Sequence, residues 1–159
     1  MKKLLRAKEG FTLIELMIVI AVIGILAAVL IPYTFRAQDR ARETGVQNAA
    51  RAIQTGLEMY ASNRTSAPWY PTTSEQITNT TGNALAALVS PAPKNPFNGE
   101  GYLDKVAGVG GTNTTFYLST SDASVGAGVI VYTTDGNSYT LTLYGAGGAT
   151  LPLKLTGGR

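Results

Sequence analysis

Three residues near the N-terminus have side chains and spacing suited to processing and to ionic pairing. Gly10 has no side chain and permits a close approach to the backbone, so the peptide bond between Gly10 and Phe11 is a candidate cleavage site. Cleavage there would give Phe11 a cationic amine. Glu15 follows Phe11 by four residues, about 6 Å along a helix at 1.5 Å per residue. The segment therefore offers an acid and an amine that can pair. The alternative is that Gly10 only opens a helix.

Conventional catalytic groups are scarce. The 159 residues include no Cys and no His, which excludes Ser-His-Asp and Cys-His catalysis, disulfides and most zinc sites. Asp122 and Asp135 are the only acids after residue 110, and they are isolated, so we expect no calcium site and no other cofactor. We expect that the chain is not an enzyme and that hydrogen-bonded strands hold its C-terminus without a disulfide.

Glu15 lies inside a long apolar run. Between Phe11 and Ile31, which span 21 residues, it is the only charged side chain. A helix needs about 20 residues to cross a bilayer core of about 30 Å, whereas the apolar part of a cleaved secretory signal has about 7–15. The run therefore predicts a retained transmembrane helix.

The formal charge of +3 comes from one part of the chain. Residues 1–10 carry four cations and one acid, whereas residues 11–62 and 63–159 are each neutral. A basic segment directly before an apolar span indicates orientation by the positive-inside rule. It does not indicate a nucleic-acid surface.

The acid in the span requires an explanation. A charge at the centre of a bilayer costs about 2.5–3.5 kcal/mol, and Glu15 lies nearer the end of the span, so the apolar residues outweigh it. Insertion therefore tolerates Glu15, but no argument from stability requires an acid at this position. An acid in lipid needs an opposite charge, which is either the Phe11 amine of a neighbouring subunit or the N-terminus of its own chain.

The pattern of the first 62 residues predicts a basic leader, residues 1–10, and one long helix, residues 11–62, of which 11–31 span the membrane. Gly24 and Pro32 weaken the helix within its apolar part. The later part carries an apolar stripe at helical spacing, which we expect to pack on the chain's own head. The stripe consists of Val46, Ala50, Ile53, Leu57 and Tyr60.

The remaining residues, 63–159, predict a globular head and hence an α+β fold. Residues 63–113 are rich in Pro, Asn, Thr and Gly and should form a variable loop with a short helix at 84–89. Residues 114–159 should form an antiparallel sheet that covers the helix stripe. Strands are expected at 115–119, on either side of a type I′ turn at Asp135-Gly136, and at 150–155, where Pro152 requires an edge position.

The stretch KEGFTLIELMIVIAVIGILAAVLIPY, residues 8–33, resembles the N-terminal signature of the type IV pilin superfamily, which includes type IV pilins and type II secretion pseudopilins. The resemblance is specific over these 26 residues and beyond them rests on architecture. It implies cleavage after Gly10 by a prepilin peptidase and N-methylation of Phe11. It also implies that Glu15 sets the register of assembly, and that the segment from Gly24 to Pro32 loses helical order in the filament.

The expected function is that of a structural subunit of a bacterial type IV pilus. A prepilin stored in the inner membrane would be processed and polymerised through its N-terminal helix into a homo-oligomeric helical filament on the cell surface. The resemblance implies a pilus assembly platform and motor as partners, and motility, adhesion to surfaces or DNA uptake as outputs. One alternative is the major pseudopilin of a type II secretion system. Another is a membrane-anchored periplasmic enzyme or binding protein, which predicts no cleavage at Gly10.

Three weaker signals lie outside this segment. Asn63, Asn79 and Asn113 begin sequences that match the N-glycosylation pattern, although such matches arise by chance in a chain rich in Asn and Thr. Trp69 and Tyr70 either form an adhesive surface or pack the loop onto the helix end, and we favour packing.

A cluster of arginines follows the span and alternates with acids. It could attract DNA phosphate, but its nearness to Asp39 and Glu43 favours salt bridges within the helix or between subunits. The arginines are Arg36, Arg40 and Arg42.

Overall fold

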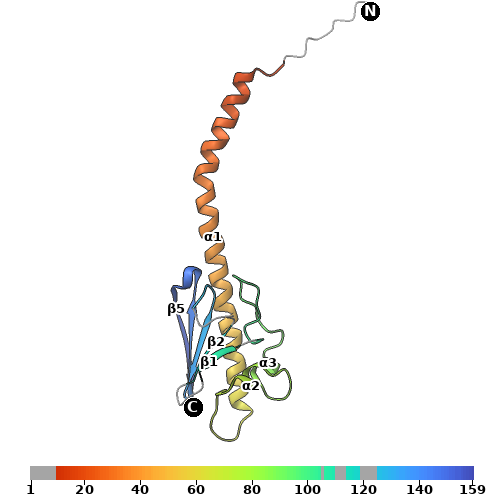
Figure 1. Cartoon of the computed structure of the whole chain (residues 1–159), viewed down its shortest axis with the longest axis vertical. Helices are drawn as coiled ribbons and strands as arrows, with labels where there is room; N and C mark the ends of the chain where they lie inside the picture. The colour runs from red at the N-terminus through yellow and green to blue at the C-terminus, as the bar shows by residue number, and fades with distance from the viewer. Residues whose placement is uncertain (1–9, 105, 110–113, 119–124) are drawn as a thin grey trace, which may run out of the picture. The chain divides into compact units, whose positions relative to one another are not determined.

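The computed structural model describes residues 10–104, 106–109, 114–118 and 125–159 of the chain (Figure 1). These residues belong to two compact units, one ending at Gln38 and the other spanning Asp39–Arg159. The helix α1, Leu13–Ser62, contributes to both units. The second unit holds a five-stranded antiparallel sheet, so the α+β class expected from the sequence is confirmed.

The sheet is a meander in which each strand pairs with the next along the chain. Its order is β1-β2-β3-β4-β5. The strands are β1 Val106–Val109, β2 Thr114–Leu118, β3 Ile130–Thr134, β4 Ser138–Tyr144 and β5 Thr150–Gly158. The strand β1 lies in the stretch that the sequence analysis assigned to loop, since four residues that include a glycine carry little strand signal.

The last strand shows how the chain holds its C-terminus. β5 is the edge strand, as Pro152 requires, and it extends beyond the expected residues to Gly158. Its pairing with β4 includes Leu155 opposite Leu141. After it, the Arg159 N–H donates to the Asn137 carbonyl at 2.9 Å. Strand hydrogen bonds therefore hold the C-terminus, as expected.

Two short helices occupy the segment between α1 and the sheet. α3, Leu85–Leu88, lies where the sequence predicted a helical turn. α2, Ser74–Thr78, was not predicted. It begins with a capping box in which Thr73 accepts from the Gln76 N–H, and the pattern Thr-x-x-Gln was the signal that could have revealed it.

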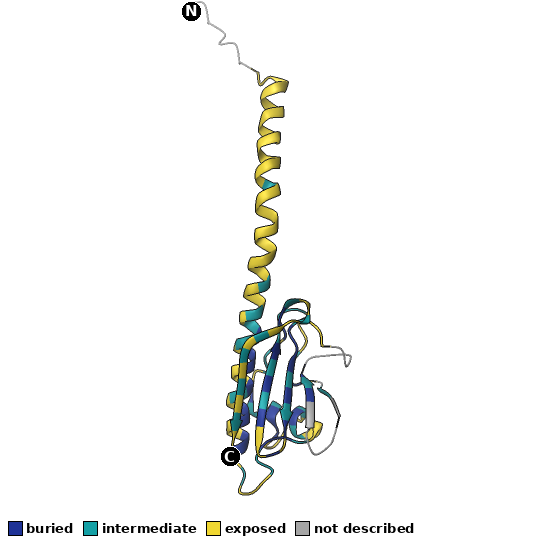
Figure 2. Ribbon diagram, turned by 90° about the vertical axis from the view of Figure 1, so that its left-hand side faces the viewer, coloured by how far each residue is buried: buried dark blue, intermediate teal, exposed yellow. Residues whose placement is uncertain are grey.

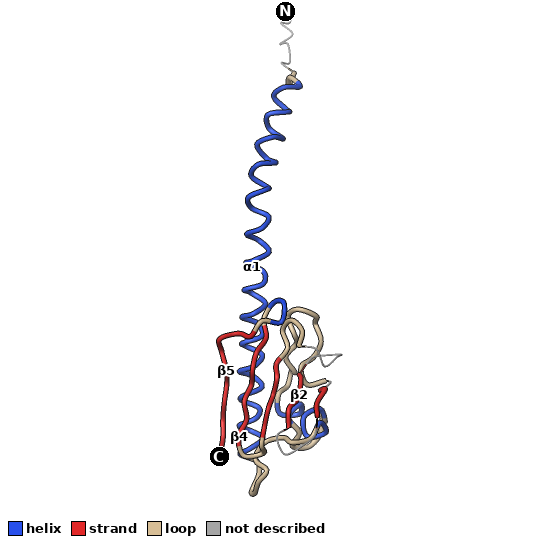
Figure 3. The backbone as a smooth tube through the Cα atoms, turned by 60° about the vertical axis from the view of Figure 1, so that its left-hand side comes forward, coloured by secondary structure: helices blue, strands red, loops and turns tan. Residues whose placement is uncertain are grey.

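The core of the second unit lies between the sheet and the C-terminal part of α1 (Figures 2 and 3). All five residues of the predicted helix stripe are buried. The β4 side chains predicted to face them are buried too: Tyr139, Leu141 and Leu143. The predicted packing of the stripe on the chain's own head is therefore confirmed.

The β3–β4 hairpin forms where the sequence predicted it, but its turn differs. Thr134 pairs with Tyr139, so four residues lie between these paired positions and the expected two-residue type I′ turn is wrong. The Asp135 carboxylate accepts the Asn137 and Ser138 N–H groups at 2.9 and 2.6 Å, which stabilises the wider turn. Gly136 has a φ of +88°, a conformation that favours glycine.

The hairpin tip also anchors the loop that follows α1. The Gly136 carbonyl accepts the backbone N–H groups of Trp69 and Tyr70 at 2.6 and 3.1 Å. Tyr70 is buried, and the Arg159 guanidinium lies 5.4 Å from the centroid of the Trp69 ring. These two aromatic residues therefore pack the loop onto the head, as favoured from the sequence.

Buried tyrosines form a layer around one acid of α1. The rings of Tyr70 and Tyr139 contact edge to face with centroids 4.7 Å apart, and Tyr132 lies 6.2 Å from Tyr139. The Tyr139 hydroxyl donates to the Glu58 carboxylate at 2.9 Å. Burial raises the pKa of Tyr139 well above its usual value, and the neighbouring Glu58 carboxylate raises this pKa further.

The layer of buried tyrosines around Glu58 predicts that the free energy of unfolding decreases at alkaline pH. The folded chain retains the Tyr139 proton at a pH where the unfolded chain, with a pKa near 10, loses it. The free energy of unfolding should therefore be constant below about pH 10 and fall above it, by up to about 1.4 kcal/mol per pH unit for each such tyrosine. Denaturant unfolding of the detergent-solubilised chain between pH 8 and 11 measures this. Tyr139→Phe should make the fall shallower, and the exposed-site control Tyr33→Phe should not; equal slopes in all three proteins would contradict the prediction.

A second prediction concerns the contact between α1 and α3. A β-carbon on Gly56 would overlap Cγ2 of Val89 and come within 3.0 Å of Cδ1 of Leu85. Gly56→Ala should therefore destabilise the head by about 1–3 kcal/mol, although alanine is the better helix former. At Gly126 the one contact of a β-carbon with the described residues is Val129, at 3.9 Å, so Gly126→Ala serves as the control. Thermal unfolding compares the two variants, and an unchanged or higher midpoint for Gly56→Ala would show that the contact is not tight.

Candidate functional site

The N-terminal part of α1 presents apolar side chains on all its sides. Every large apolar residue between Phe11 and Phe35 is exposed (Figure 2). Among the described residues, α1 is the helix long and apolar enough to cross a membrane. A helix that is apolar all round requires lipid or other apolar helices around it. The exposed residues are Phe11, Leu13, Ile14, Leu16, Met17, Ile18, Val19, Ile20, Val22, Ile23, Ile25, Leu26, Val29, Leu30, Ile31, Tyr33 and Phe35.

Glu15 forms a capping box with Thr12 at the start of α1. The Glu15 N–H donates to Oγ1 of Thr12 at 3.3 Å. In return, Oε2 of Glu15 accepts from the Thr12 N–H at 2.9 Å and from the Thr12 hydroxyl at 2.7 Å. This reciprocal arrangement satisfies N–H groups that have no partner inside the helix.

The capping box adds a local role for Glu15 that the sequence analysis did not consider. Its carboxylate caps the first turn and lies at the positive end of the helix dipole, which is a reason from stability for an acid at this position. The signal was present as Thr-x-x-Glu before an apolar run, from Thr12 to Glu15. The sequence analysis therefore missed Thr12 as a functional residue.

The cap uses only one of the two carboxylate oxygens. Within the described residues, Oε1 of Glu15 accepts no hydrogen bond, whereas Oε2 accepts two. An ionised carboxylate can accept from both oxygens. Glu15 can therefore cap its own helix and bind a second donor at the same time.

Gly10 and Phe11 lie outside α1, which begins at Leu13. Thr12 caps the helix, so Gly10 is not the residue that opens it. Gly10 is exposed, an added β-carbon there would have no atom of the described residues within 4 Å, and Phe11 is 87% exposed. The peptide bond between them is therefore accessible to a peptidase, and cleavage there remains a prediction.

α1 continues through the two residues expected to weaken it. Gly24 and Pro32 both lie inside the helix, and Pro32 has no N–H to donate to the carbonyl four residues before it. Near the proline, the Thr34 hydroxyl donates to the Ile31 carbonyl at 2.7 Å. The expected loss of helical order concerns the assembled filament, and it remains a prediction.

The charged residues after the apolar part include one pair within the helix. Arg42 and Asp39 approach to 3.8 Å, three residues apart, and both are exposed, so the pair contributes little to stability. Glu43 instead accepts the Ala146 N–H at 3.3 Å. The expected salt bridge is thus present for Arg42, and no described ion pair involves Arg36 or Arg40.

Two of the three candidate glycosylation sites lie in described residues. The Asn63 amide donates to Asn83 at 2.9 Å, and the Asn79 side chain accepts the N–H and the hydroxyl of Thr81. Asn113 lies outside the described residues, as does Asp122. Glycosylation stays a prediction. Within the described ranges, no three Asp or Glu side chains gather where they could hold a metal ion.

The fold and the capped N-terminal segment define a protein of the prepilin type: an apolar helix followed by an antiparallel head. Residues 5–31 match the model of the prokaryotic N-terminal methylation motif. The chain is 37% identical to the type II secretion system core protein G of Pseudomonas aeruginosa over 106 residues, covering 64% of this chain and 66% of the relative, just under two thirds.

Other relatives include both secretion proteins and pilins. The core protein G of Vibrio cholerae is 32% identical over 126 residues, covering 77% of each chain. The type IV wide pilus major component PilA4 of Thermus thermophilus is 52% identical over 56 residues, covering 35% of this chain and 43% of the relative. The chain belongs to the type IV pilin superfamily. These relatives are named as pilus or secretion components, which fits the expectation of a non-enzyme. No solved structure matches the chain significantly.

The capping box yields a prediction that separates the role of Thr12 from the charge of Glu15. Thr12→Val removes the hydroxyl while it preserves shape and the Glu15 carboxylate. Loss of a cap costs about 0.5–2 kcal/mol, so hydrogen exchange at the Glu15 amide should accelerate by roughly 2- to 30-fold. NMR of the full chain in detergent micelles measures this rate. Thr12→Ser keeps the hydroxyl and should exchange at the native rate, and an unchanged rate in Thr12→Val would show that the cap does not form.

Proposed function

We propose that the chain is the prepilin of a bacterial type IV pilus. Its leader, residues 1–10, is removed after Gly10 by a prepilin peptidase, and the new N-terminus at Phe11 is methylated. The processed subunit is stored in the inner membrane through residues 11–31. It then polymerises through α1 into a homo-oligomeric filament on the cell surface.

One observation carries this proposal: the apolar side chains between Phe11 and Phe35 are exposed and surround α1 on all sides. Lipid can surround these side chains before assembly, and copies of the same helix can surround them afterwards. Membership of the pilin superfamily supports the same sequence of events.

Glu15 provides a register for the assembly. Its Oε2 caps α1 through Thr12, which leaves Oε1 to accept from the Phe11 amine of an adjacent subunit. A wrong axial offset would leave a buried charge without a partner, at a cost of about 3–5 kcal/mol. The ionic pair therefore selects one offset between neighbouring helices, which apolar contacts alone do not specify.

The partners follow from this route. The prepilin peptidase acts at Gly10, and a pilus assembly platform and motor extract the subunit from the membrane. The head, residues 63–159, is then exposed along the filament, where it contacts surfaces or DNA. The outputs are adhesion, twitching motility or DNA uptake.

The major pseudopilin of a type II secretion system is a second candidate. The observation that favours it is the length of the alignments, which reach 106 and 126 residues with two core G proteins and 56 residues with the pilus component PilA4. The higher identity with that pilus component, 52%, supports the pilus instead. The two candidates share processing and assembly and differ in the length and place of the filament.

Shearing the producing cells separates these candidates. We expect micrometre filaments in the sheared fraction by electron microscopy, with a subunit whose intact mass lacks residues 1–10 and includes one methyl group. Filaments found only on overexpression, with most protein in the membrane fraction, would favour the pseudopilin. A subunit that retains its leader and never polymerises would contradict both candidates.

The role of the Glu15 charge is tested by Glu15→Gln, because glutamine can still complete a capping box. The yield of sheared filaments should fall at least about tenfold, since the cationic terminus of the neighbour then has no charged partner. Ile18→Val, a small change in the same apolar segment, is the control and should assemble normally. Native yields from Glu15→Gln would show that the charge does not guide assembly.

A further inference from the structure

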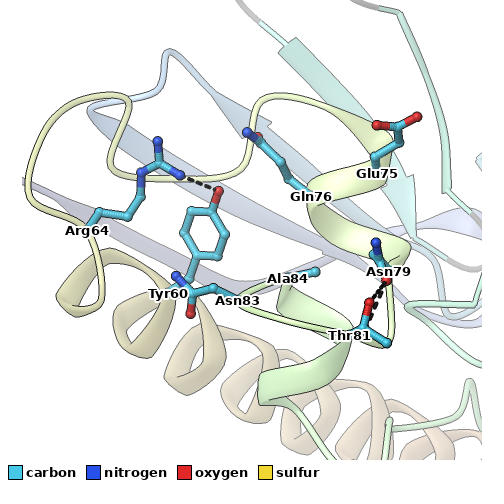
Figure 4. A pocket seen from close by; sticks show the side chains of 8 residues that line it. All are labelled: Tyr60, Arg64, Glu75, Gln76, Asn79, Thr81, Asn83 and Ala84. Atoms are coloured by element: carbon cyan, nitrogen blue, oxygen red, sulfur yellow. Dashed lines mark hydrogen bonds between the residues drawn. The ribbon is translucent and has the colours of Figure 1, made fainter.

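A small cavity lies in the head, between the end of α1 and the segment that contains α2 (Figure 4). Its volume is about 300 Å³, near the lower limit for small-molecule sites, which run from about 300 to 1,000 Å³. Tyr60, Arg64 and Asn83 lie on one side, and the side chains of Gln76 and Asn79 lie on the other. One lining residue, Asn79, begins a candidate N-glycosylation sequence, and no other motif of the sequence analysis includes a residue of this cavity.

The cation of the cavity is held in position with most of its donors unused. Arg64 donates from Nη1 to the Tyr60 hydroxyl at 2.9 Å, and its guanidinium lies 5.4 Å from the centroid of the Tyr60 ring. Its Nε is buried and has no hydrogen-bond partner among the described residues. Tyr60 is itself only 3% exposed and cannot turn away, so the guanidinium is fixed beside the cavity.

The Gln76 amide is oriented by the backbone. Its Oε1 accepts the Thr72 N–H at 2.8 Å and the Thr73 N–H at 3.3 Å. A backbone N–H can only donate, so the oxygen of this amide must face these two groups and its NH₂ must face the other way. In Figure 4 the Gln76 nitrogen points toward Arg64.

The same rule orients Asn79, whereas Asn83 pairs with another side-chain amide. Oδ1 of Asn79 accepts the Thr81 N–H at 2.9 Å and the Thr81 hydroxyl at 2.8 Å. Oδ1 of Asn83 accepts from the Asn63 amide at 2.9 Å. In the described part of the chain, no NH₂ group of Asn79, Asn83 or Gln76 donates a hydrogen bond. The oxygens of these amides are therefore already hydrogen-bonded, and their NH₂ groups remain available as donors.

We propose that this cavity binds the carboxylate of an acidic sugar, with Arg64 as the charged donor and the amides of Gln76 and Asn79 as neutral donors. Fixed donors around one cation are complementary to an oxyanion, and a guanidinium can hold a carboxylate by two parallel hydrogen bonds. The volume accommodates one sugar unit with its hydroxyl groups. Glu75, the acid of the lining, is exposed and points away from Arg64, where it can accept a sugar hydroxyl but weakens anion binding at longer range (Figure 4).

An acidic polysaccharide fits these observations better than DNA. DNA binding depends on several cations that follow the phosphate backbone. Arg64 is the one cation among the residues that line the cavity, all of which are described. The inference deepens the proposed function, because it names the chemistry of a surface to which the exposed head would adhere.

The test measures binding by the full chain in detergent, so that it does not depend on filament assembly. The probe is trigalacturonate, with the neutral trisaccharide maltotriose, inorganic phosphate and a short DNA duplex as comparisons, all by isothermal titration calorimetry. We expect trigalacturonate to bind at least about tenfold more tightly than maltotriose and phosphate. Equal affinity for phosphate, or tighter binding of DNA that also requires Arg64, would overturn the assignment to an acidic sugar.

Paired variants test the residues. Arg64→Gln should weaken trigalacturonate binding at least about tenfold, whereas Arg51→Gln, at an exposed arginine of the same helix outside the cavity, should leave it unchanged. Glu75→Gln, at an exposed position, should strengthen binding by a few fold, so the proposal remains testable if Arg64→Gln fails to fold. Affinity that none of these substitutions alters would overturn the proposal.

A failure of the sugar-binding proposal can be distinguished from a failure of the proposed pilus function. Cells that produce Arg64→Gln should still release sheared filaments in native amounts, because Arg64 follows the end of α1 and lies outside the exposed apolar segment between Phe11 and Phe35. If the native chain forms filaments but binds no sugar, the sugar-binding proposal is refuted and the pilus proposal stands. If the native chain binds the sugar but never polymerises, the pilus proposal is refuted and the sugar-binding proposal stands.

Discussion

One carboxylate in an apolar segment constrains the rest of the N-terminal unit. In lipid or between packed helices no water is present to solvate Glu15, so its two oxygens need partners from protein. Thr12 provides donors for Oε2 within the chain, and Oε1 stays open. The cap therefore provides donors for one oxygen, and in the proposed filament the amine of a neighbouring subunit provides the partner for the other. The same residue can thus stabilise a helix before assembly and specify a neighbour afterwards.

The two parts of α1 have apolar side chains suited to different surroundings. The first part is apolar on every side and has no single preferred face, which suits both lipid and a bundle of identical helices. The second part is amphipathic, and its stripe from Val46 to Tyr60 packs against β4 and the loops around it. Small residues such as Gly56 let α3 approach the helix closely. Stability of the head and stability of the filament therefore depend on separate sets of residues.

Much of this architecture could be predicted because its signals are periodic and local. The span, the helix stripe, the β3–β4 hairpin and the edge position of β5 all follow from spacing or from a proline. The wider turn was not predicted from Asp135-Gly136, because the Asp135 carboxylate binds the Asn137 and Ser138 N–H groups, whereas the Asp-Gly pair alone favours a two-residue turn. The donors around Arg64 could not be predicted either, because they come from segments that only folding brings together. The Thr12 cap could have been predicted from the sequence. It was missed because Glu15 was considered as a charge and not as a hydrogen-bond acceptor.

The arrangement around Glu15 in the assembled state decides between an intermolecular pair and a purely local cap. A cryo-electron microscopy structure of the native filament, at a resolution that shows side chains, measures the distance between the Glu15 carboxylate and the nearest Phe11 amine of another subunit. The account predicts that Oε1 lies within about 4 Å of that amine while Oε2 keeps its bonds to Thr12. A filament in which Glu15 contacts Thr12 alone, with every neighbouring amine beyond the reach of an ion pair, would contradict it.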